Sequence, residues 1–247
     1  MNPIIITNNL VEEKKIYWLY PILIWLSFFP TSLIYLFFFN FFSFWIDPIF
    51  IICFLPISLV LYYLVFILFL LLFAKLILIL LNMINKPKEG IFQRNFQDKN
   101  YRFFVIRTCL KRFVLKIYNY FPLPWAKILA LRLFGVKISN NTGILDSFID
   151  SDFIVIGDNV ILGEGSLVMN SMILGDYLLV RKVILNRGCT IGAFSVIAPG
   201  TIVEEGAILG MGSYTYLNQR LEKNYIHFGR PAKRWKKIED NFTFSKK

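Results

Sequence analysis

Residues 138–213 repeat a hydrophobic pattern with a period of six. An aliphatic residue opens each unit and a small or aliphatic residue returns four places later, as in IGDNVI from Ile156, IGAFSV from Ile191 and LGMGSY from Leu209. We interpret the following as opening positions, with a slip of one residue in the middle and Asp150 as the exception to the aliphatic pattern: Ile138, Ile144, Asp150, Ile156, Leu162, Val168, Leu174, Leu179, Leu185, Ile191, Ile197, Val203 and Leu209.

This period predicts a parallel β-helix over residues 138–213. Each unit supplies one short strand and one bend, three units complete a triangular turn, and the opening side chain points into a narrow core. Glycine recurs at the second and fourth positions, which suits bends that need a positive φ or a close approach of two backbones. A β-sandwich fits less well, because its strands recur every ~8–12 residues.

Two long apolar segments lie within residues 16–85. No charged residue occurs in 16–46 or in 48–74, and about 20 apolar residues suffice for a helix to cross a bilayer. The pattern therefore predicts two transmembrane helices, roughly Tyr17–Phe42 and Pro56–Ile84, in which Pro30 and Pro56 are positions for a bend or an end. A buried core helix or a cleaved signal peptide fits these lengths less well.

Basic residues flank the two apolar segments, whereas the loop between them, which carries aromatic residues around Trp45, has none. The positive-inside rule then places the flank 1–15, the chain after residue 85 and both termini on the cytoplasmic side of the cell membrane. Lys75 lies inside the second segment, where it either extends toward the head groups or faces a bundle interior or substrate passage. The flanking residues are Lys14, Lys15, Lys86 and Lys88.

The region 86–137 carries most of the net charge of +11, with twelve Lys or Arg residues against Glu89 and Asp98. This block directly follows a predicted transmembrane helix, where anionic lipid head groups attract basic residues. We therefore expect membrane lipid, and no nucleic acid, as its partner. The placement of the charge decides this, since a high overall charge by itself would also suit nucleic acid.

Apolar residues recur at helical spacing in the same region, with basic residues between them. This pattern predicts a basic amphipathic helix that lies at the membrane interface, followed by a short helix over Trp125–Phe134. The two helices alternatively cap the end of the β-helix, and both roles are compatible. The apolar positions are Phe103, Ile106, Leu110, Phe113 and Ile117, and the basic ones are Arg107, Lys111, Arg112 and Lys116.

The predicted fold class is thus membrane α + β: a transmembrane helical hairpin (16–85), basic interfacial helices (86–137), a parallel β-helix (138–213) and a closing segment with a basic tail (214–247). The fraction of hydrophobic residues, 56%, excludes an ordinary soluble domain. The three cysteines have the spacing of neither a zinc site nor a disulfide framework, and no metal site is expected. We expect the chain to leave the coil over Tyr214–Asn224 and to fray at 241–247.

Four segments resemble known families: LRLFGVKI at 131–138, LGEGSLV from Leu162, RGCTIGAFSVIAPGTIVEEGAILGMGS from Arg187, and GRPAK at 229–233. The six-residue repeat as a whole is similar to the hexapeptide-repeat superfamily of trimeric acyltransferase-like proteins. The four segments, within residues 85–235, more narrowly resemble the membrane-embedded terminal domains of polylysine-synthetase-type nonribosomal peptide synthetases. The resemblance implies a left-handed β-helix. It also implies a homotrimer, because this chain has one copy of the domain where those synthetases carry three in tandem.

The resemblance also implies transfer of an acyl or aminoacyl group from acyl-CoA or a carrier-protein thioester to an amine or hydroxyl acceptor. A coil histidine is expected as general base near the block LVMNSMI, but Asn170 and Ser171 stand there instead. These two residues are candidates for orienting a substrate without acting as bases. The one histidine, His227, lies in the closing segment, either as an exposed loop residue or as a base. Asp176 becomes a candidate base if burial raises its pKa.

Binding of the thioester is expected in a groove between subunits. The resemblance suggests Arg230, Lys233 and Arg234 as partners for the phosphates of coenzyme A, and Asn186, with Lys182 and Arg187, as groove residues. Alternatively, the basic tail rests on the membrane, and the polar coil residues are ordinary turn residues. Two function classes therefore stay open: a membrane-anchored acyltransferase-like enzyme, or a non-catalytic trimeric scaffold that retains the β-helix.

Overall fold

The computed structural model describes residues 6–7, 14–45, 48–121, 123–144 and 146–238. The chain divides into two compact units. One comprises Val11–Lys86 and Val105–Ile117, and the other comprises Met1–Leu10, Pro87–Phe104 and Tyr118–Lys247. The expected connecting loop at residues 46–47 and the expected frayed end at 241–247 lie outside the described residues.

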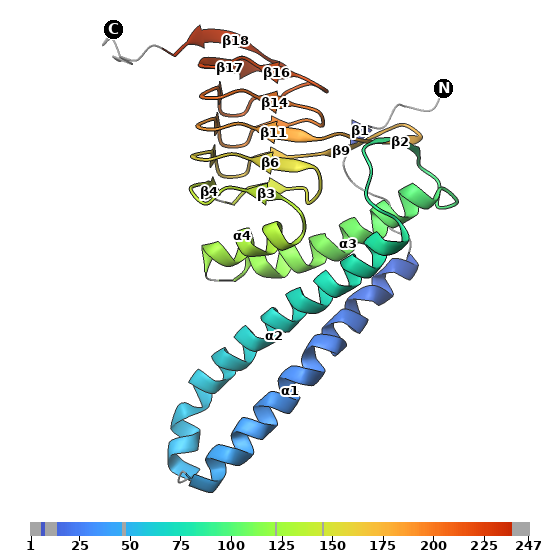
Figure 1. Cartoon of the computed structure of the whole chain (residues 1–247). Helices are drawn as coiled ribbons and strands as arrows, with labels where there is room; N and C mark the ends of the chain where they lie inside the picture. The colour runs from blue at the N-terminus through green and yellow to red at the C-terminus, as the bar shows by residue number, and fades with distance from the viewer. Residues whose placement is uncertain (1–5, 8–13, 46–47, 122, 145, 239–247) are drawn as a thin grey trace. The chain divides into compact units, whose positions relative to one another are not determined.

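The second of these units contains a coil of three sheets with parallel strand pairing (Figure 1). The first sheet holds β3 (Lys137–Ile138), β6 (Ile154–Ile156), β11 (Val183–Leu185), β14 (Ile202–Val203) and β16 (Arg220–Leu221). The second sheet holds β4 (Gly143–Ile144), β7 (Ile161–Leu162), β12 (Thr190–Ile191), β15 (Ile208–Leu209), β17 (Tyr225–Gly229) and the antiparallel β18 (Ala232–Lys237). The third sheet holds β5 (Phe148–Ile149), β8 (Leu167–Val168) and β13 (Val196–Ile197).

The core of this coil is formed by the opening positions of the six-residue units. Ile156, Leu162 and Ile191 are at most 1% exposed. Each pairs in register with the opening residue of the next turn, as Ile156 does with Leu185. Because every strand bonds to the turns above and below, identical positions stack and form one continuous apolar column. The predicted parallel β-helix is confirmed, whereas its left-handed sense stays a prediction.

A β-hairpin interrupts the coil where the sequence pattern loses its phase. It consists of β9 (Ser171–Leu174) and β10 (Tyr177–Val180), and it forms an antiparallel sheet with β1 (Ile6–Thr7) and β2 (Gly90–Gln93). Val168 pairs with Ile197 and Ile156 pairs with Leu185, so Leu185 is the next opening position after Val168. The predicted slip of one residue, with Leu174 and Leu179 as opening positions, is therefore wrong. Leu174 and Leu179 belong to the strands of the hairpin, whose alternating apolar residues resemble the six-residue pattern in the sequence.

The apparent exception at Asp150 has a simple explanation in the register. Ile149, rather than Asp150, pairs with Val168 and occupies the opening position of that turn. Ile149 is 3% exposed and supplies the apolar contact that the repeat demands. Asp150 is the next residue, so its side chain does not have to fill the apolar opening position.

The coil also continues beyond residue 213. β16 pairs in parallel with β14, and β17 pairs in parallel with β15. The opening positions of this last part are Thr215, Leu221 and His227, each at most 3% exposed. The expectation that the chain leaves the coil over Tyr214–Asn224 is therefore wrong. Two of these three opening residues are polar, so the hydrophobic pattern of the sequence does not reveal them.

Two adjacent backbones approach closely at the second position of several units. A Cβ atom on Gly192 would lie 2.5 Å from the backbone nitrogen of Met211 and 2.7 Å from its Cα. No larger residue fits there without displacing the next turn. The glycines at the fourth position allow the positive φ that the bend needs, as the φ of +68° at Gly188 shows.

Helix α4 (Pro124–Leu133) precedes the first turn of the coil. Proline at its first position already has the required φ and lacks an N–H that would stay unpaired there. The prediction of a short helix over Trp125–Phe134 is confirmed to within one residue at each end.

The other unit is built on two long helices, α1 (Leu19–Trp45) and α2 (Pro48–Ile84), preceded by the 3-10 helix Lys14–Trp18. Pro30 and Pro56 lie inside these helices and do not end them. Both helices are long and apolar enough to cross a membrane. Within the most apolar 18 residues of each helix, only 17% in the first and 28% in the second are buried, so most of these apolar side chains face outward.

Hydroxyl groups join the two long helices. The Ser32 hydroxyl lies 3.0 Å from that of Tyr62, and the Tyr35 hydroxyl lies 3.2 Å from that of Ser58. Such bonds fix how two apolar helices align, because apolar surface alone does not specify a partner in lipid.

Helix α3 (Lys99–Asn119) contributes residues to both units. Lys116 is exposed, but Arg107 and Lys111 are each only 3% exposed. The Arg107 guanidinium donates to the Asn85 carbonyl at 2.6 Å. The predicted amphipathic helix therefore exists, but the expectation of a basic face open to lipid is wrong at these two positions, since spacing alone does not reveal what covers a face.

Candidate functional site

His227 lies in the interior of the coil. It belongs to β17, pairs in register with Leu209 and is 3% exposed, so the expectation of an exposed loop residue is wrong. Its Nε2 accepts a hydrogen bond from the backbone N–H of Glu222 at 3.3 Å. Burial lowers the pKa of His227 below 6.5, and the Tyr225 carbonyl and the Glu222 carboxylate oppose this shift. The neutral imidazole is thus the form that the fold favours.

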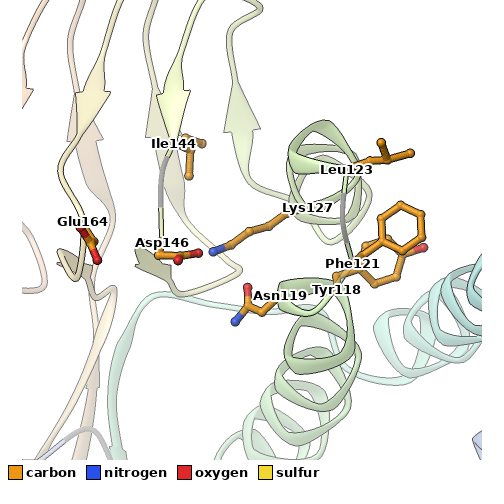
Figure 2. Close-up of a pocket in the computed structure, with 8 residues that line it drawn as sticks. All are labelled: Tyr118, Asn119, Phe121, Leu123, Lys127, Ile144, Asp146 and Glu164. Atoms are coloured by element: carbon orange, nitrogen blue, oxygen red, sulfur yellow. The ribbon is translucent and has the colours of Figure 1, made fainter.

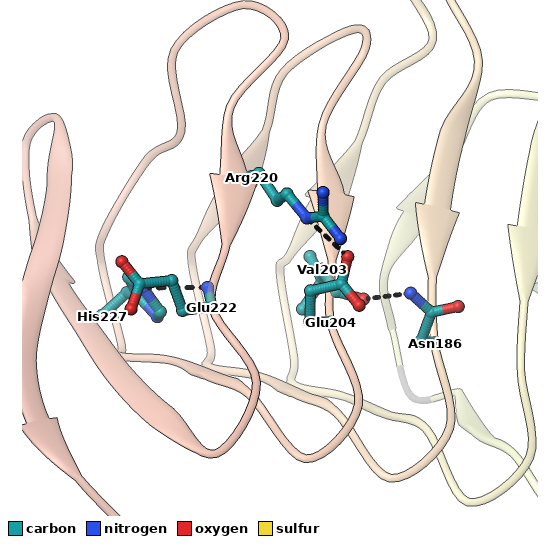
Figure 3. Close-up of polar contacts among 6 residues, drawn as sticks. All are labelled: Asn186, Val203, Glu204, Arg220, Glu222 and His227. Carbon is teal, nitrogen blue, oxygen red and sulfur yellow. Dashed lines mark hydrogen bonds and ion pairs between the residues drawn. The ribbon is translucent and has the colours of Figure 1, made fainter.

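On three successive turns, a polar residue comes directly after the strand of the first sheet (Figure 3). Asn186, Glu204 and Glu222 each come directly after an opening position of that sheet. The Asn186 amide donates to the Val203 carbonyl at 3.0 Å, and Arg220 donates to Glu204 at 2.8 Å. Asn186 therefore holds two turns together, and its amide oxygen faces away from that bond.

The closing hairpin of β17 and β18 gathers the three predicted phosphate-binding residues. All three side chains are exposed. The Nε of Arg230 donates to the Gly212 carbonyl at 2.6 Å, and Arg234 donates to the Glu222 carboxylate at 2.9 Å. Lys233 makes no ion pair among the described residues. Arg230, Lys233 and Arg234 thus form a local cationic surface, hereafter the closing-hairpin cations.

Asn170 and Ser171 lie at the base of the inserted hairpin, and both are nearly fully buried, at 2% and 4% exposure. The Asn170 amide donates to the Asp152 carbonyl, and the Ser171 hydroxyl lies 3.2 Å from the Asp150 carboxylate. These contacts tie the hairpin to the turn before it. Asp150 was not selected by sequence reasoning, although its polar character at an aliphatic position was the available signal.

Asp176 lies at the tip of the same hairpin, and its side chain is exposed. The burial on which its role as a base depends is therefore absent. Its backbone carbonyl accepts from the Arg94 N–H at 2.8 Å. Lys182 lies at the end of the hairpin, where its backbone N–H donates to the Glu89 carboxylate at 2.8 Å.

The four candidate catalytic residues do not converge. Asn170 and Ser171 follow the third sheet on one of the early turns, His227 belongs to the second sheet on the last turn, and Asp176 lies outside the coil. Neighbouring strands of a sheet are about 4.8 Å apart, so these positions are separated by several turns of the coil. Within one chain they cannot act together on a single reacting group.

Cys189 lies in the core of the coil. Cys189 is fully buried, and burial raises the pKa of its thiol to about 12, so it is an inert core residue. Among the described residues there is no group of three His, Cys, Asp or Glu side chains that would hold a metal ion.

A cavity of about 400 Å³ lies at the other end of the coil, next to α4 (Figure 2). Lys127 reaches across it and donates to the Ser147 carbonyl at 2.9 Å. Burial lowers the pKa of the Lys127 ammonium, and Asp146 opposes this shift. Sequence reasoning missed this cavity, because its walls come from three separate segments of the chain. The lining residues are Tyr118, Asn119, Phe121, Leu123, Lys127, Ile144, Asp146 and Glu164.

Comparison with known families supports the repeat. Residues 182–216 match the family model described as the hexapeptide repeat of succinyl-transferase. This match confirms the predicted hexapeptide-repeat character of that segment. The narrower resemblance to terminal domains of nonribosomal peptide synthetases stays a prediction. No curated protein matches the sequence.

Three solved structures of acyl- or acetyltransferases are among those similar to this chain. A maltose O-acetyltransferase from Clostridium difficile 630 is 18% identical, with 62% of this chain and 94% of that chain covered and a TM-score of 0.49. A hexapeptide-repeat acetyltransferase from Vibrio cholerae O1 biovar eltor, complexed with acetyl coenzyme A, is 13% identical, with coverages of 59% and 93% and a TM-score of 0.46.

The third is a mutant of AntD, an N-acyltransferase from Bacillus cereus, in complex with dTDP-4-amino-4,6-dideoxyglucose and coenzyme A. It is 21% identical, with 42% of this chain and 64% of that chain covered and a TM-score of 0.39. This chain therefore spans less than two thirds of that enzyme.

Proposed function

We propose that the protein is a membrane-anchored, hexapeptide-repeat acyltransferase. It would transfer an acyl or aminoacyl group from a thioester, either acyl-CoA or a carrier-protein thioester, to an amine or hydroxyl acceptor at the cytoplasmic membrane surface. The observation that carries the proposal is the parallel β-helix whose residues 182–216 match the hexapeptide repeat of succinyl-transferase.

The closing-hairpin cations support a thioester that carries phosphate groups. Arg230, Lys233 and Arg234 are exposed within one short hairpin, and charge-assisted bonds to phosphate are among the stronger polar contacts. In this proposal Asn186, two turns from the hairpin, would complete the binding surface with its amide oxygen. Coenzyme A would bind there as a co-substrate that exchanges with solvent, and it would not be held firmly between turnovers.

Catalysis in this proposal requires residues from more than one copy of the chain, because the candidates do not converge within one. The predicted homotrimer provides three identical grooves between subunits. His227 would be the general base if the closing hairpin opens, since its lowered pKa favours the neutral imidazole. Asn170 and Ser171 would orient a substrate without acting as bases.

Membrane attachment in this proposal rests on α1 and α2. Their length, their apolar composition and their outward-facing side chains support a membrane-spanning hairpin. Basic flanking residues support a cytoplasmic location of the coil. An acceptor that is itself bound to lipid would then be within reach.

The direct test is thiol release from acyl-CoA by the full chain in mild detergent, measured with candidate amine and hydroxyl acceptors. We expect acceptor-dependent release. Lys233→Gln, which removes an exposed charge that makes no ion pair among the described residues, should raise KM for acyl-CoA about fivefold and leave kcat unchanged. Lys137→Gln is the matched control at the opposite end of the coil, and it should change neither constant.

A non-catalytic trimeric scaffold is the second candidate function. It is favoured by the burial of His227, which at 3% exposure sits out of reach of a substrate in this conformation. Absence of turnover with every donor, together with no thermal shift of the full chain on addition of coenzyme A, would support the scaffold and contradict the enzyme.

A further inference from the structure

The cavity beside α4 has one charged wall and one apolar wall. Figure 2 shows Asp146 and Glu164 on the side of the coil, with Tyr118, Phe121 and Leu123 on the opposite side. Its volume of about 400 Å³ lies in the range of small-molecule sites, roughly 300–1,000 Å³. A ligand that matches both walls must combine a polar head with an apolar part.

The two carboxylates stand on adjacent turns of the coil. Ile144 pairs in register with Leu162, so Asp146 and Glu164, two residues further along, are also neighbours. The Gly165 N–H confirms this by donating to the Asp146 carbonyl at 2.9 Å. The backbones of neighbouring turns are about 4.8 Å apart, so the two carboxylates start from adjacent positions, where like charges repel each other and attract a cation.

Lys127 balances only one of these charges. Its ammonium is held by the Ser147 carbonyl and faces Asp146, whose charge opposes the effect of burial on the lysine. Glu164 makes no ion pair among the described residues. The cavity therefore retains one uncompensated negative charge when one lysine and two carboxylates are counted.

We propose that this cavity binds a small organic amine as its ammonium ion. The ammonium would lie beside Glu164 and Asp146, and the apolar part of the ligand would contact Phe121 and Leu123. A metal ion is disfavoured, since the described lining offers only two carboxylates and no other ligand of that kind. The inference does not depend on acyl transfer, because it concerns binding alone.

The cavity is also distinct from the other candidate residues. Ile144 and His227 belong to the same sheet, with the strands β7, β12 and β15 between their own strands. At about 4.8 Å per strand, the two positions are about 19 Å apart. A ligand in this cavity would not reach the closing hairpin.

The test is titration of the full chain in detergent with n-butylammonium, with n-butanol and butyrate as neutral and anionic probes of the same size, followed by saturation-transfer NMR. We expect the affinity order n-butylammonium, n-butanol, butyrate. Glu164→Gln should weaken n-butylammonium binding about fivefold, as expected for a partly solvated ion pair. Asp158→Asn, which removes an exposed turn carboxylate outside the cavity, should leave it unchanged.

Lys127→Met separates this proposal from an anion site. It removes the one positive charge of the lining, so it should strengthen n-butylammonium binding, whereas an anion site would lose affinity for butyrate. The proposal is wrong if butyrate binds more tightly than n-butylammonium, or if Glu164→Gln and Asp158→Asn behave alike. Circular dichroism of each variant verifies that the coil is intact.

Discussion

At the scale of single residues, position within the six-residue unit decides what each side chain can do. His227 occupies the same register position as Leu209, so its chemistry is governed by the coil core rather than by solvent. Asp150 and Ser171 contact each other because a one-residue change of register frees Asp150 from the core position. Residue type alone predicted neither environment.

The burial of His227 predicts that stability depends on pH. Its pKa is lowered in the folded state, so the unfolded chain binds the proton more readily, and the stabilisation is present above pH ~6.5 and is lost as pH falls toward the folded pKa. The loss amounts to at most about 1.4 kcal/mol per pH unit in that window. Thermal unfolding between pH 7.5 and 5.5 measures it.

The control for this prediction is His227→Leu, which places at that position the residue found at Leu209 and Leu221. The variant should lose less stability on acidification than the wild type, because it lacks the His227 imidazole and keeps every other titratable group. Equal losses in the two proteins would contradict the assignment.

Gly192 provides the second residue-scale prediction. Gly192→Ala would place a methyl group 2.5 Å from the next turn, so we expect a loss of about 1–3 kcal/mol of stability, the usual cost of overpacking. Gly143→Ala is the matched control, since its nearest neighbour, a side-chain atom of Ile161, would lie at an ordinary 3.9 Å. Thermal unfolding of both variants decides the matter, and equal effects would refute the close-approach argument.

At the scale of elements, the coil and the inserted hairpin are separate structures joined at two points. Met169 donates to Ile197 and Val183 donates to Phe153 within the coil, while Arg181 donates to Asn170 at the base of the hairpin. The hairpin's own sheet is completed by β1 and β2 rather than by the coil. The repeat therefore does not need the hairpin in order to propagate.

Deletion of residues 170–180 tests this separation. It leaves six-residue spacing between Val168 and Leu185, so the far-UV circular dichroism of the β-helix should persist. We expect a stability loss of about 1–3 kcal/mol from the buried polar contacts of Asn170 and Ser171. Deletion of 170–179 is the matched control: the phase is then wrong by one residue, side chains change face, and the protein should aggregate.

At the scale of the whole molecule, the homotrimer stays a prediction, and exposed apolar residues of the coil support it. One such residue comes shortly after the opening position of the second sheet on each of three successive turns, and exposed apolar patches usually mark an interface. We expect cross-linking in mild detergent to end at the trimer. The residues are Phe194 at 65% exposure, Met211 at 67% and Phe228 at 57%.

Met211→Lys should shift the assembly toward the monomer, because it introduces a charge into that surface. Asp158→Lys adds a lysine at an exposed turn elsewhere and should leave the trimer intact. A cross-linking ladder that stops at the dimer would contradict threefold assembly for the wild-type chain.

Membrane attachment is a separate whole-molecule prediction. The full chain should stay in the membrane pellet after alkaline carbonate washing and require detergent for extraction, as expected for two apolar spans. Replacing Leu70 and Leu71 by lysine should reduce insertion, since charge is costly at mid-bilayer. Release of the unmodified chain by carbonate would contradict the predicted spans.

The sequence by itself determined the parts of this protein that depend on local periodicity. A six-residue period forces a parallel coil, and apolar runs of more than 20 residues form long helices, because each pattern requires only that neighbouring units repeat the same geometry. The glycines of the coil followed for the same reason, since their positions are set within each unit.

Only the tertiary structure decided the features that depend on distant segments. The burial of Arg107 and His227, the partner of Asp150 and the cavity around Lys127 all arise where separate stretches of chain meet. A linear pattern records which residues share a face but not what covers that face. For this reason the fold was predictable, whereas the candidate site had to be built from the coordinates.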